Sequence, residues 1–376
     1  VEPGSPIIFP CVDMVSIGAG GGSVAWVDAG GSLRNGPQSM GANPGPACYG
    51  KGGEEATNTD ANLVLGRLSA QNFLGGRMKI SKRLAERAIQ AKVAKPLGYD
   101  VVEAADAIVQ IANANMMDAI RLVSVRRGYD PREFVLVAFG GAGPLHAPWL
   151  AKELGIPAVV VPPWPGLTSS FGCQLLDLRH DVSKTMIMRT DSVDLLALER
   201  EFRELEAEVA ARLTAEGVRP ADRRIMRQLD MRYLGQWRAL RISCPRKLTG
   251  HALNGVLAAF HSTHQREHAF SRPEHPVEIY GARVAGLGVT KKPRLRRIKS
   301  GGTPEVALKG RERVYFAERG FEETPVYERH LLPADVTLEG PCRLDQMDST
   351  IVIPPMFHGH TDGYGNVIIR PREGTP

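Results

Sequence analysis

The strongest hydrophobic pattern lies in the stretch FVLVAFGGAGPLHAPWLAKEL, residues 134–154. Apolar and small residues run without interruption from Val135 to Phe139 and lead into a turn of glycines. Leucine and tryptophan then recur at spacings near three and four, the period of a helix with one apolar face. The pattern predicts a buried strand, a glycine turn and a helix that begins at the turn.

This arrangement is also a candidate binding site. A helix N-terminus presents unpaired backbone N–H groups, and glycines let a ligand approach the backbone closely because they carry no Cβ. We therefore single out Gly140, Gly141, Ala142 and Gly143 as candidate residues for binding an anion or a nucleotide. Ordinary α/β turns use glycine as well, so a purely structural turn is the open alternative.

A second strand, of the parallel type, is predicted at 158–161, where the chain reads AVVV. Strand, helix and strand in this order form a right-handed crossover in an α/β layer. We expect the proline-rich loop from Pro162 to Gly172 to close over the sheet edge that carries the glycine turn, because α/β proteins bind ligands at that edge.

Two helices are predicted before the central strand. The first helix begins at Ser81 and runs to Lys95, where Pro96 and Gly98 interrupt it. The second helix begins at position 100 or 101 and has an apolar stripe. Its small side chains predict close packing; they are Ala104, Ala105, Ala107, Ala112 and Ala114.

The character of the chain changes near Asp191. Residues 195–213 predict a charged amphipathic helix, and residues 227–244 have a β pattern. The following helical segment carries histidines at i, i+3 and i+7, namely His261, His264 and His268. Three imidazoles on one face are able to bind a metal ion, but we favour a solvated helix because no carboxylate or cysteine spacing supports a site.

From Arg313 onward, short strands alternate with glycine and proline turns. This pattern predicts a small β sandwich or roll with a structural role. The fold class is therefore α/β, with three consecutive domains: an α/β domain at 1–190, an α+β domain at 191–300 and a β-rich domain at 301–376.

The segment IGAGGGSVAWVDAGG predicts a glycine loop followed by a hairpin. Consecutive glycines can present several N–H groups to a phosphate or a developing oxyanion. We therefore predict Gly20, Gly21, Gly22 and Ser23 as cofactor-binding residues, with a packing turn as the alternative. The loop that follows is rich in glycine, asparagine, aspartate and threonine, a composition frequent at functional sites.

Composition narrows the function classes. Hydrophobic residues make up 43% and charged residues 23% of the 376 positions, as in folded globular proteins. The formal charge of +6 is modest, and the basic residues are scattered. The one basic cluster, Lys291–Lys299, is short and contains a proline, so we interpret it as a solvated connector and expect no nucleic-acid partner.

The cysteines and the chain ends bear on compartment. Five cysteines lie far apart without CxxC spacing, which indicates a reducing compartment rather than a disulfide framework. The sequence shows no signal peptide and no long apolar run, so we expect a cytoplasmic protein without a membrane partner. It has no initiator methionine and opens with VEPGSPIIFP, which suggests a start part-way through a domain.

Several motifs, in order, resemble the hydantoinase A / 5-oxoprolinase family. They are IGAGGGSVAWVD, GANPGPACYGKGG, TDANLVLGRL, GYDPREFVLVAFGGAGPLHA and LDMRYLGQ. The tail, LEGPCRLDQMDSTIVIPP, is similar to the family's C-terminal β segment. The resemblance covers nearly the whole chain, and the family includes the nucleotide-binding subunits of acetone and acetophenone carboxylases.

The resemblance implies an actin/hexokinase-like ATPase lobe, which is a ribonuclease H-like fold, followed by smaller α+β and β-rich regions. It implies ATP and Mg²⁺ as cofactors and phosphorylation of a carbonyl oxygen, which makes that oxygen a better leaving group. In the family's hydrolases this step opens a cyclic amide, and in its carboxylases it drives C–C bond formation. Gly140 to Gly143 match the family's adenosine-side turn.

Two departures from the family pattern qualify the resemblance. The phosphate-gripping hairpins of the DxGGTxTD type do not occur in this sequence and normally lie upstream of the IGAGGGS segment. We therefore expect the chain to be the C-terminal half to two-thirds of such a protein, with the Mg²⁺ and phosphate apparatus elsewhere. Many relatives also read D-x-H-x-I-G where this chain has Val15 at the histidine position.

By resemblance, the implied function is ATP-dependent hydrolysis of a cyclic amide such as a hydantoin or 5-oxoproline, within a hetero-oligomer that includes a hydantoinase B-like subunit. The alternative enzyme is the nucleotide-binding subunit of an ATP-dependent ketone carboxylase. A third hypothesis is a non-catalytic scaffold, a truncated lobe that holds the hydantoinase B-like partner.

Four further candidates lie in or beside the glycine-rich segments: Asp13, Cys48, Asp60 and His146. Asp13 and Asp60 are the candidate catalytic carboxylates. Asp13, Cys48 and His146 are the predicted Zn²⁺ ligands, because carboxylate, thiolate and imidazole together suit that metal. The alternatives are a loop-ordering Asp60, a buried structural Cys48 and a hydrogen-bonded His146 at a helix start.

Overall fold

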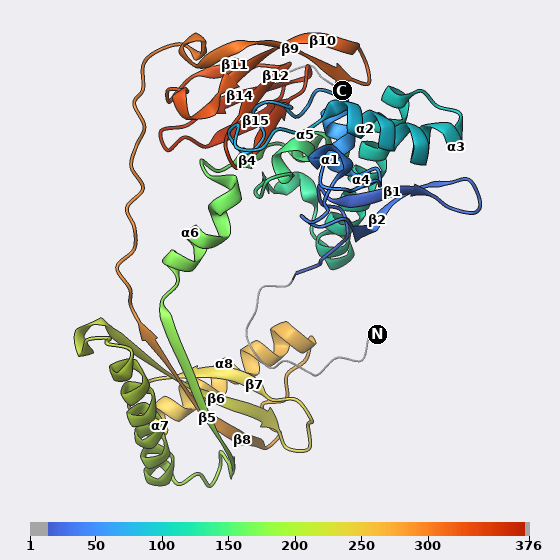
Figure 1. The fold of residues 1–376 in the computed structure, drawn as a ribbon. Coiled ribbons are helices and arrows are strands. Elements are labelled where there is room, and N and C mark those ends of the chain that lie inside the picture. Colours follow the sequence, from blue (N-terminus) through green and yellow to red (C-terminus); the bar gives the residue numbers. More distant parts are fainter. Residues whose placement is uncertain (1–13, 373–376) are drawn as a thin grey trace. The chain divides into compact units, whose positions relative to one another are not determined.

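The computed structural model describes residues 14–372. The chain divides into two compact units: the first unit comprises the residues up to Ser170 and those from Leu295 onward, and the second is Phe171–Arg294 (Figure 1). The predicted series of three consecutive domains would separate strands that share a sheet here, because β15 (Val367–Pro371) pairs with β4 (Val159–Val161).

The N-terminal part of the first unit is a hairpin beside a group of helices. β1 (Ser23–Val27) and β2 (Leu33–Ser39) pair antiparallel, which confirms the predicted hairpin. The helical elements up to the central strand are η1 (Ala47–Tyr49), α1 (Asn58–Val64), α2 (Lys82–Ile89), the π-helix η2 (Gln90–Ala94), α3 (Lys95–Leu97), α4 (Val101–Val123), η3 (Val125–Arg127) and η4 (Pro131–Glu133).

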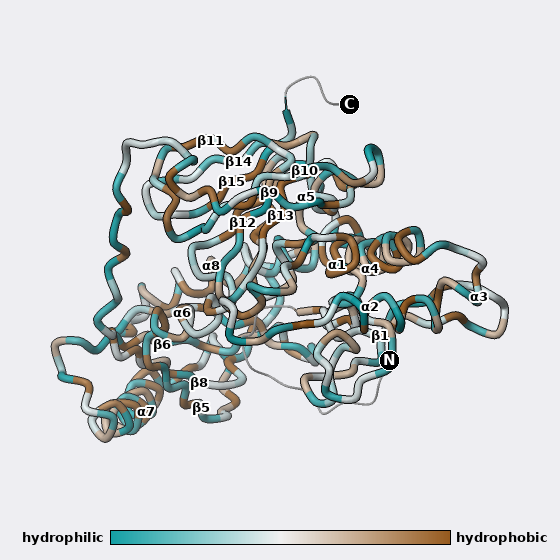
Figure 2. Tube along the Cα trace, turned by 45° about the horizontal axis from the view of Figure 1, so that its top comes forward, coloured by the Kyte–Doolittle hydropathy of each residue, from teal (hydrophilic) through white to brown (hydrophobic). Residues whose placement is uncertain are grey.

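The long helix α4 forms as its pattern predicted. The Asp100 carboxylate caps it by accepting hydrogen bonds from the N–H groups of Val102 and Glu103, both at 2.8 Å. Of its small residues, Ala104, Ala105 and Ala112 are buried. The helix packs against α1, α2, β2 and α5 (Gly143–Leu154), and Figure 2 shows the hydrophobic colouring along it. The helix therefore contacts both the hairpin that follows the glycine loop and α5, which follows the glycine turn.

The helix that starts at Ser81 continues beyond the predicted stop at Pro96. Its last turn before the proline is a π turn, in which the Lys95 N–H bonds to the carbonyl of Gln90. Pro96 therefore lies in the first turn of α3, where a missing N–H is tolerated. The helix ends at Gly98, whose φ of +73° is in the left-handed region.

A five-stranded sheet carries the glycine turn. Its order is β11 (Thr337–Glu339), β14 (Phe357–Thr361), β15, β4 and β3 (Leu136–Val137). β3 and β4 are parallel, as the strand–helix–strand pattern predicted. β3 is an edge strand of two residues and Val137 is 53% exposed, so the predicted buried strand at 135–139 was wrong: among described residues only β4 pairs with it.

A second sheet of the first unit has the order β13 (Thr350–Ile353), β12 (Cys342–Asp345), β10 (Gly320–Glu328) and β9 (Leu308–Phe316). Short helices η7 (Pro304–Ala307) and η8 (Arg329–Leu331) flank it. The buried Arg343 joins it to the α1 region, with Nη1 2.9 Å from the carbonyl oxygen of Gly66. This sheet therefore brings the β12–β13 loop to the helical part of the unit.

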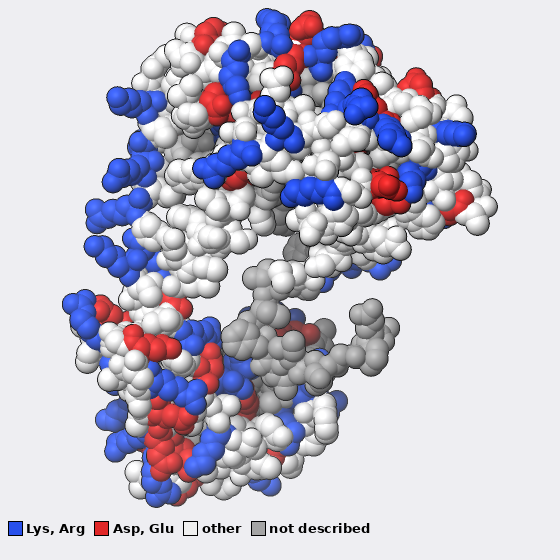
Figure 3. Space-filling model, viewed as in Figure 1, with Lys and Arg blue, Asp and Glu red and all other residues white. Residues whose placement is uncertain are grey.

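The second unit is an antiparallel sheet in the order β5 (Leu178–Arg189), β8 (Val277–Gly288), β6 (Arg223–Tyr233) and β7 (Leu240–Cys244). Its helices are α7 (Leu195–Ala215), η6 (Pro220–Asp222) and α8 (Gly250–His268). Before them, η5 (Pro165–Leu167) lies in the first unit and α6 (Thr168–Leu175) spans the boundary between the units. α7 packs on β5, β6 and β8, as its amphipathic pattern predicted, and Figure 3 shows acidic side chains gathered over it.

The solvated face that we favoured for the three histidines of α8 holds for His268, which is exposed, but not for His264. His264 is 1% exposed; its Nδ1 lies 2.8 Å from the Phe270 carbonyl and its Nε2 3.1 Å from Gln236 Nε2. His261 Nδ1 lies 2.8 Å from the Tyr233 hydroxyl. The correction has a physical reason: the returning loops supply polar partners that let an imidazole be buried.

Two further expectations concern the connector and membranes. Residues 289–299 contain no helix or strand, and their lysines and arginines are exposed or half-buried, as expected of a solvated connector (Figure 3). In the part of the chain that the structure describes, no helix combines the length and the apolar character needed to cross a membrane.

Candidate functional site

The glycine turn between β3 and α5 is held from two sides. Gly140 has φ +81°, in the left-handed region that favours glycine, and its N–H donates to the Pro165 carbonyl at 2.7 Å. On the other side, Ser349 Oγ lies 3.2 Å from the carbonyl oxygens of Gly140 and Gly141. No side chain caps α5 at Ala142. The first-turn N–H groups are thus not covered by a capping side chain, as a binding helix N-terminus requires.

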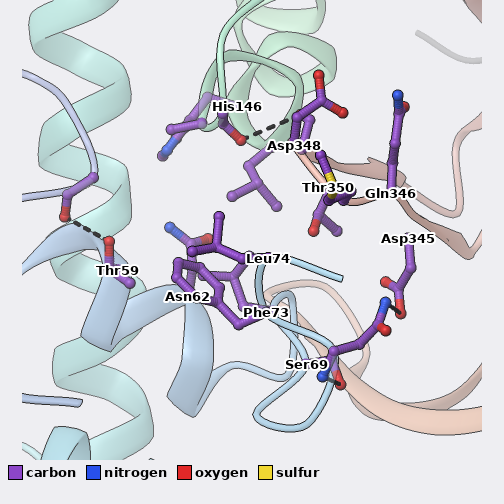
Figure 4. Close-up of a pocket in the computed structure, with 18 of the residues that line it drawn as sticks. Thr59, Asn62, Ser69, Phe73, Leu74, His146, Asp345, Gln346, Asp348 and Thr350 are labelled. Carbon is purple, nitrogen blue, oxygen red and sulfur yellow. Dashed lines mark hydrogen bonds between the residues drawn. The ribbon is translucent and has the colours of Figure 1, made fainter. Parts of the chain in front are cut away.

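A pocket of about 220 Å³ lies at this helix N-terminus (Figure 4). Its lining comes from the glycine loop, from α1 and the loop after it, from the start of α5 and from the β12–β13 loop. The side chains labelled in Figure 4 include Thr59, Asn62, His146, Asp345, Asp348 and Thr350. Two of them are carboxylates, and no lysine or arginine is among the described lining residues. The pocket therefore suits neutral or donor groups of a ligand better than phosphates.

His146 is the buried titratable group of this pocket. It lies in the first turns of α5, is 2% exposed, and its Nδ1 is 2.7 Å from Asn113 Oδ1 on α4. Burial, and secondarily the charge of Arg67, lower the pKa of His146 to about 4. The imidazole is therefore neutral at pH 7.

Arg67 lies close enough to His146 for its charge to affect the imidazole. The sequence analysis did not predict this arginine as part of the site. It is 2% exposed, its guanidinium lies 4.5 Å from the centroid of the Trp149 ring, and Nη2 is 3.5 Å from Asp106 Oδ1. Burial lowers the pKa of Arg67 to about 10, so it stays cationic at pH 7. The only hint in the sequence is a lone arginine in the apolar TDANLVLGRL segment.

The β12–β13 loop also contributes to the site, although the sequence analysis gave the C-terminal strands a structural role. Asp348 Oδ2 accepts a hydrogen bond from the Gly166 N–H at 2.8 Å, and Gln346 Nε2 donates to the Pro163 carbonyl at 2.7 Å. These bonds fix the loop over the glycine turn. The sequence analysis predicted only a structural role for these strands, but the loop between β12 and β13 also supplies residues that line the pocket.

The glycine loop before β1 is tied into the fold through its carbonyls. The Gly20 carbonyl accepts from Asn58 Nδ2 at 2.8 Å, and the Gly21 carbonyl accepts from the Thr59 N–H at 2.8 Å. Ser23 Oγ accepts from the Gly20 N–H at 2.8 Å. A Cβ on Gly21 would lie 2.9 Å from Thr59 Oγ1, so this glycine permits close packing. Of the four predicted residues, Gly21 lines the pocket.

Asp60 has the contacts of a loop-ordering carboxylate. It is fully buried and accepts hydrogen bonds from the Cys48 N–H at 2.7 Å, the Ala47 N–H at 3.3 Å, the Thr57 N–H at 3.0 Å and the Thr57 hydroxyl at 2.7 Å. With Thr57 it forms the capping box of α1. Its carboxylate holds the loop that carries Cys48 against the start of the helix. A catalytic role for Asp60 stays a prediction.

The structure shows the alternatives that were weighed against zinc. Cys48 is buried, and burial followed by the nearby Asp60 charge raises the pKa of its thiol. His146 is hydrogen-bonded to Asn113. Within residues 14–372, no group of three or more His, Cys, Asp or Glu side chains is placed to hold a metal ion. Asp13 lies outside the described residues, so its catalytic role and the three-ligand zinc site stay predictions.

Comparisons with known proteins agree with the motifs. The family model for Hydantoinase/oxoprolinase matches residues 2–182, and the model for the Hydantoinase/oxoprolinase C-terminal domain matches residues 190–369. An uncharacterized protein of Methanocaldococcus jannaschii is 43% identical over 96% of this chain and 51% of its own length. The caprolactamase subunit alpha of Pseudomonas jessenii is 36% identical over 92% of this chain and 51% of its own length.

Two solved structures share the fold. A nucleotide-free structure of acetone carboxylase, described under the mechanism of ATP-dependent acetone carboxylation, matches with a TM-score of 0.87 and 29% identity. The crystal structure of the ATP-dependent caprolactamase from Pseudomonas jessenii matches with a TM-score of 0.73 and 34% identity. Both matches cover 94% of this chain and 52% of the solved chain.

This chain spans about half the length of the two relatives and the two solved chains named above. Within that half, the two family models follow each other from residue 2 to residue 369 with a short gap. The motifs that carried the resemblance lie within the matched ranges, and the solved relatives have the same fold. The chain belongs to the hydantoinase/oxoprolinase family.

Proposed function

We propose that this chain supplies the nucleoside-binding side of the ATP site in an ATP-dependent cyclic amide hydrolase. The observation that carries the proposal is the pocket at the N-terminus of α5, with its two carboxylates and neutral imidazole and without lysine or arginine in its described lining. Adenine and ribose offer N–H and O–H donors to such acceptors, whereas phosphates call for cations or clustered N–H groups.

The first unit is proposed to correspond to the second lobe of an actin/hexokinase-like ATPase, a ribonuclease H-like fold. The parallel β3–α5–β4 unit with a glycine turn at the helix start supports this assignment. In this proposal Gly140 to Gly143 form the adenosine-side turn. Gly141 and Ala142 line the pocket, which supports binding of the nucleoside beside their backbone.

Mg²⁺ and the phosphates are proposed to be bound mainly outside this chain. Mg²⁺ accompanies nucleotide phosphates with one or two carboxylates and water rather than an all-protein cage. Among the described residues, no group of three or more His, Cys, Asp or Glu side chains could hold a metal ion. The other half of the family protein would hold the phosphates, and a hydantoinase B-like subunit would complete a hetero-oligomer. The naming of a relative as a subunit supports such an assembly.

In the proposed reaction, ATP transfers its terminal phosphoryl group to the carbonyl oxygen of the cyclic amide. ADP leaves, and the phosphorylated carbon is activated so that water adds to it. The adduct expels the ring nitrogen, which takes up a proton, and the C–N bond opens to leave an acyl phosphate. A second water hydrolyses the acyl phosphate and releases phosphate. The residues of this chain bind and orient the nucleoside, which positions the phosphates for transfer. His146, neutral and buried, acts as a hydrogen-bonding group rather than as a cation.

A ketone carboxylase subunit is the second candidate. The TM-score of 0.87 with acetone carboxylase favours it. Phosphorylation of the same oxygen applies there, because it holds the ketone as an enol phosphate. When the phosphoryl group passes to water, the P–O bond breaks, the enol carbon bonds to carbon dioxide and the ketone carbonyl is regenerated. The nucleoside pocket would serve both reactions, and the substrate would be chosen elsewhere in the assembly.

The test is turnover by the complex co-purified from cells with its natural partners. ADP release is measured with ATP and, in separate reactions, hydantoin, 5-oxoproline, caprolactam and acetophenone with bicarbonate. ADP formed only with a cyclic amide supports the hydrolase, and ADP formed only with acetophenone supports the carboxylase. If no substrate causes ADP release above the level without substrate, both functions are contradicted.

A further inference from the structure

We infer that Asn113 is a positioning residue that sets the tautomer of His146, so that the imidazole presents Nε2 to the pocket as a hydrogen-bond acceptor for an N–H or O–H donor of the bound nucleoside. This inference rests on the proposed nucleotide site and deepens it. It names the group that reads the nucleoside and the side chain that orients that group.

The geometry of the pair carries the first step. Asn113 lies on α4 and His146 on α5, and the two helices pack against each other. The distance from Asn113 Oδ1 to His146 Nδ1 is 2.7 Å, a normal hydrogen bond. An amide oxygen is only an acceptor, so Nδ1 must carry the hydrogen. In the neutral ring, Nε2 is then unprotonated.

The orientation of the Asn113 amide follows from its other neighbours. A second pocket, of about 320 Å³, is lined by Asn113 together with Asp106, Glu153 and Glu318. These three carboxylates outweigh the single cation in that lining, Arg67. The amide NH₂ is favoured on the side of net negative charge, which leaves Oδ1 for His146.

The charge state of the ring is set by its surroundings. His146 is 2% exposed, and the cation of Arg67 stands close enough to oppose a second positive charge. Two carboxylates of the β12–β13 loop, Asp345 and Asp348, also line the pocket. Asp345 is paired with Arg343, whose Nε lies 2.9 Å from Asp345 Oδ1. The ring therefore stays neutral at pH 7 and serves as an acceptor rather than as an anion-binding cation.

The acceptor is available to a ligand. His146 lines the pocket at the start of α5, and Nε2 makes no hydrogen bond to the described part of the chain. A nucleoside has three kinds of donor that fit: the exocyclic amine of adenine, the ribose 2′-hydroxyl and the ribose 3′-hydroxyl. The α- and β-phosphates of ATP carry no hydrogen at pH 7, and the terminal phosphate is mostly deprotonated, so phosphates act mainly as acceptors. The chemistry therefore assigns Nε2 to the nucleoside and not to the phosphates.

The first experiment is NMR of the chain with ¹⁵N-labelled histidine, with His146 assigned by loss of its signals in His146→Gln. We expect wild type to show the Nδ1–H tautomer at pH 7. Asn113→Leu should lose this single tautomer, whereas Asn113→Asp, which keeps an acceptor oxygen, should retain Nδ1–H. A wild-type ring protonated at Nε2 alone overturns the inference, and the result does not depend on any nucleotide being bound.

The second experiment titrates adenosine, 2′-deoxyadenosine, 3′-deoxyadenosine and purine riboside into wild type and variants. Adenosine should bind Asn113→Leu about tenfold more weakly, as expected when a buried donor or acceptor loses its partner. One of the analogues lacks the group that donates to Nε2, and this analogue should bind wild type more weakly than adenosine does. Its affinity should be the same for Asn113→Leu as for wild type. The matched control is Asn115→Leu, because Asn115 lies on α4 as Asn113 does. This variant removes the hydrogen bond from Asn115 Nδ2 to the Asn35 carbonyl of β2 and should keep wild-type affinity.

The two experiments separate the two claims. Equal losses in Asn113→Leu and Asn115→Leu overturn the positioning role, because helix packing alone would then explain them. Absence of adenosine binding to wild type overturns the nucleoside assignment and the proposed function with it. In that case the tautomer still decides whether Asn113 sets the state of His146.

Discussion

Ser349 donates a hydrogen bond to the carbonyl of Gly141, with the two oxygens 3.2 Å apart. The residues are 208 positions apart in the sequence, so a loop of the C-terminal sheet holds the turn in front of α5. The pocket therefore exists only when β12 and β13 have packed. The ligand binding that we propose at the turn therefore depends on the C-terminal part of the chain.

Ser349→Ala should loosen the glycine turn. It removes the one hydroxyl hydrogen that the carbonyls of Gly140 and Gly141 share. Such a hydrogen bond contributes about 1 kcal/mol, so we expect adenosine affinity to fall about fivefold by calorimetric titration. Ser124→Ala is the control, because Ser124 Oγ donates to the Ile120 carbonyl at 2.6 Å within α4. If both variants bind adenosine equally well, the Ser349 bonds do not hold the site.

Asp60→Asn should destabilise the first unit. An amide cannot accept all four of the bonds that the carboxylate accepts, and we expect a loss of about 2–4 kcal/mol in the free energy of unfolding by denaturant titration. Asp362→Asn is the comparison, since that half-buried carboxylate orders a loop by accepting bonds from the N–H groups of Tyr364 and Asn366, both at 2.9 Å. Lost turnover at unchanged stability would instead support a catalytic Asp60.

His146 should make folding sensitive to acid. Its pKa falls from 6.5 to about 4 on folding, so below pH 6.5 the unfolded chain binds a proton that the folded chain does not. Stability is complete above pH 6.5 and is lost as the pH falls to about 4, by up to about 3 kcal/mol. His146→Gln should lack this part of the decline in urea unfolding curves. Parallel pH profiles for wild type and variant would contradict the assignment.

The predictable part of the fold was the part with local patterns. The β1–β2 hairpin, α4 and α7 followed from turn residues and from apolar spacing. An apolar run alone does not reveal how many neighbours a strand has, and so β3 was predicted as buried although it lies at a sheet edge. Local pattern therefore gave the type of each element and not its place in a sheet.

The candidate site was predictable to a similar degree. The glycine turn and His146 are at the pocket because both belong to one strand–turn–helix motif. Arg67, Asn113 and the β12–β13 loop reach it through contacts between distant segments, which no spacing in the sequence reports. The burial of His264 was missed for a related reason, since its partner Gln236 comes from a distant segment and its partner Phe270 from the loop that folds back after α8.

Gly21→Ala tests the glycine loop. The new methyl would lie 2.9 Å from Thr59 Oγ1, so we expect the Thr59 side chain to shift at the pocket wall and adenosine affinity to fall about fivefold. The double variant Gly21→Ala/Thr59→Ala relieves the contact and should recover most of the affinity lost through it, relative to Thr59→Ala alone. A loss that persists would show that the loop N–H groups act on the ligand directly.

The central claim is that the turn at the start of α5 binds the nucleoside, and Gly141→Val tests it most directly. A Cβ at this position would lie 3.5 Å from the Asp348 carbonyl oxygen, so alanine fits, whereas the branched methyls of valine fill the pocket. Gly363→Val is the control, because no atom lies within 4 Å of a Cβ there. The measurement is calorimetric titration of adenosine and ATP into this chain. We predict that Gly141→Ala and Gly363→Val bind each ligand with an affinity within about threefold of the wild-type affinity for that ligand. Gly141→Val should bind each ligand at least about tenfold more weakly than wild type while keeping the wild-type melting temperature. Equal affinity of wild type and Gly141→Val would contradict the account.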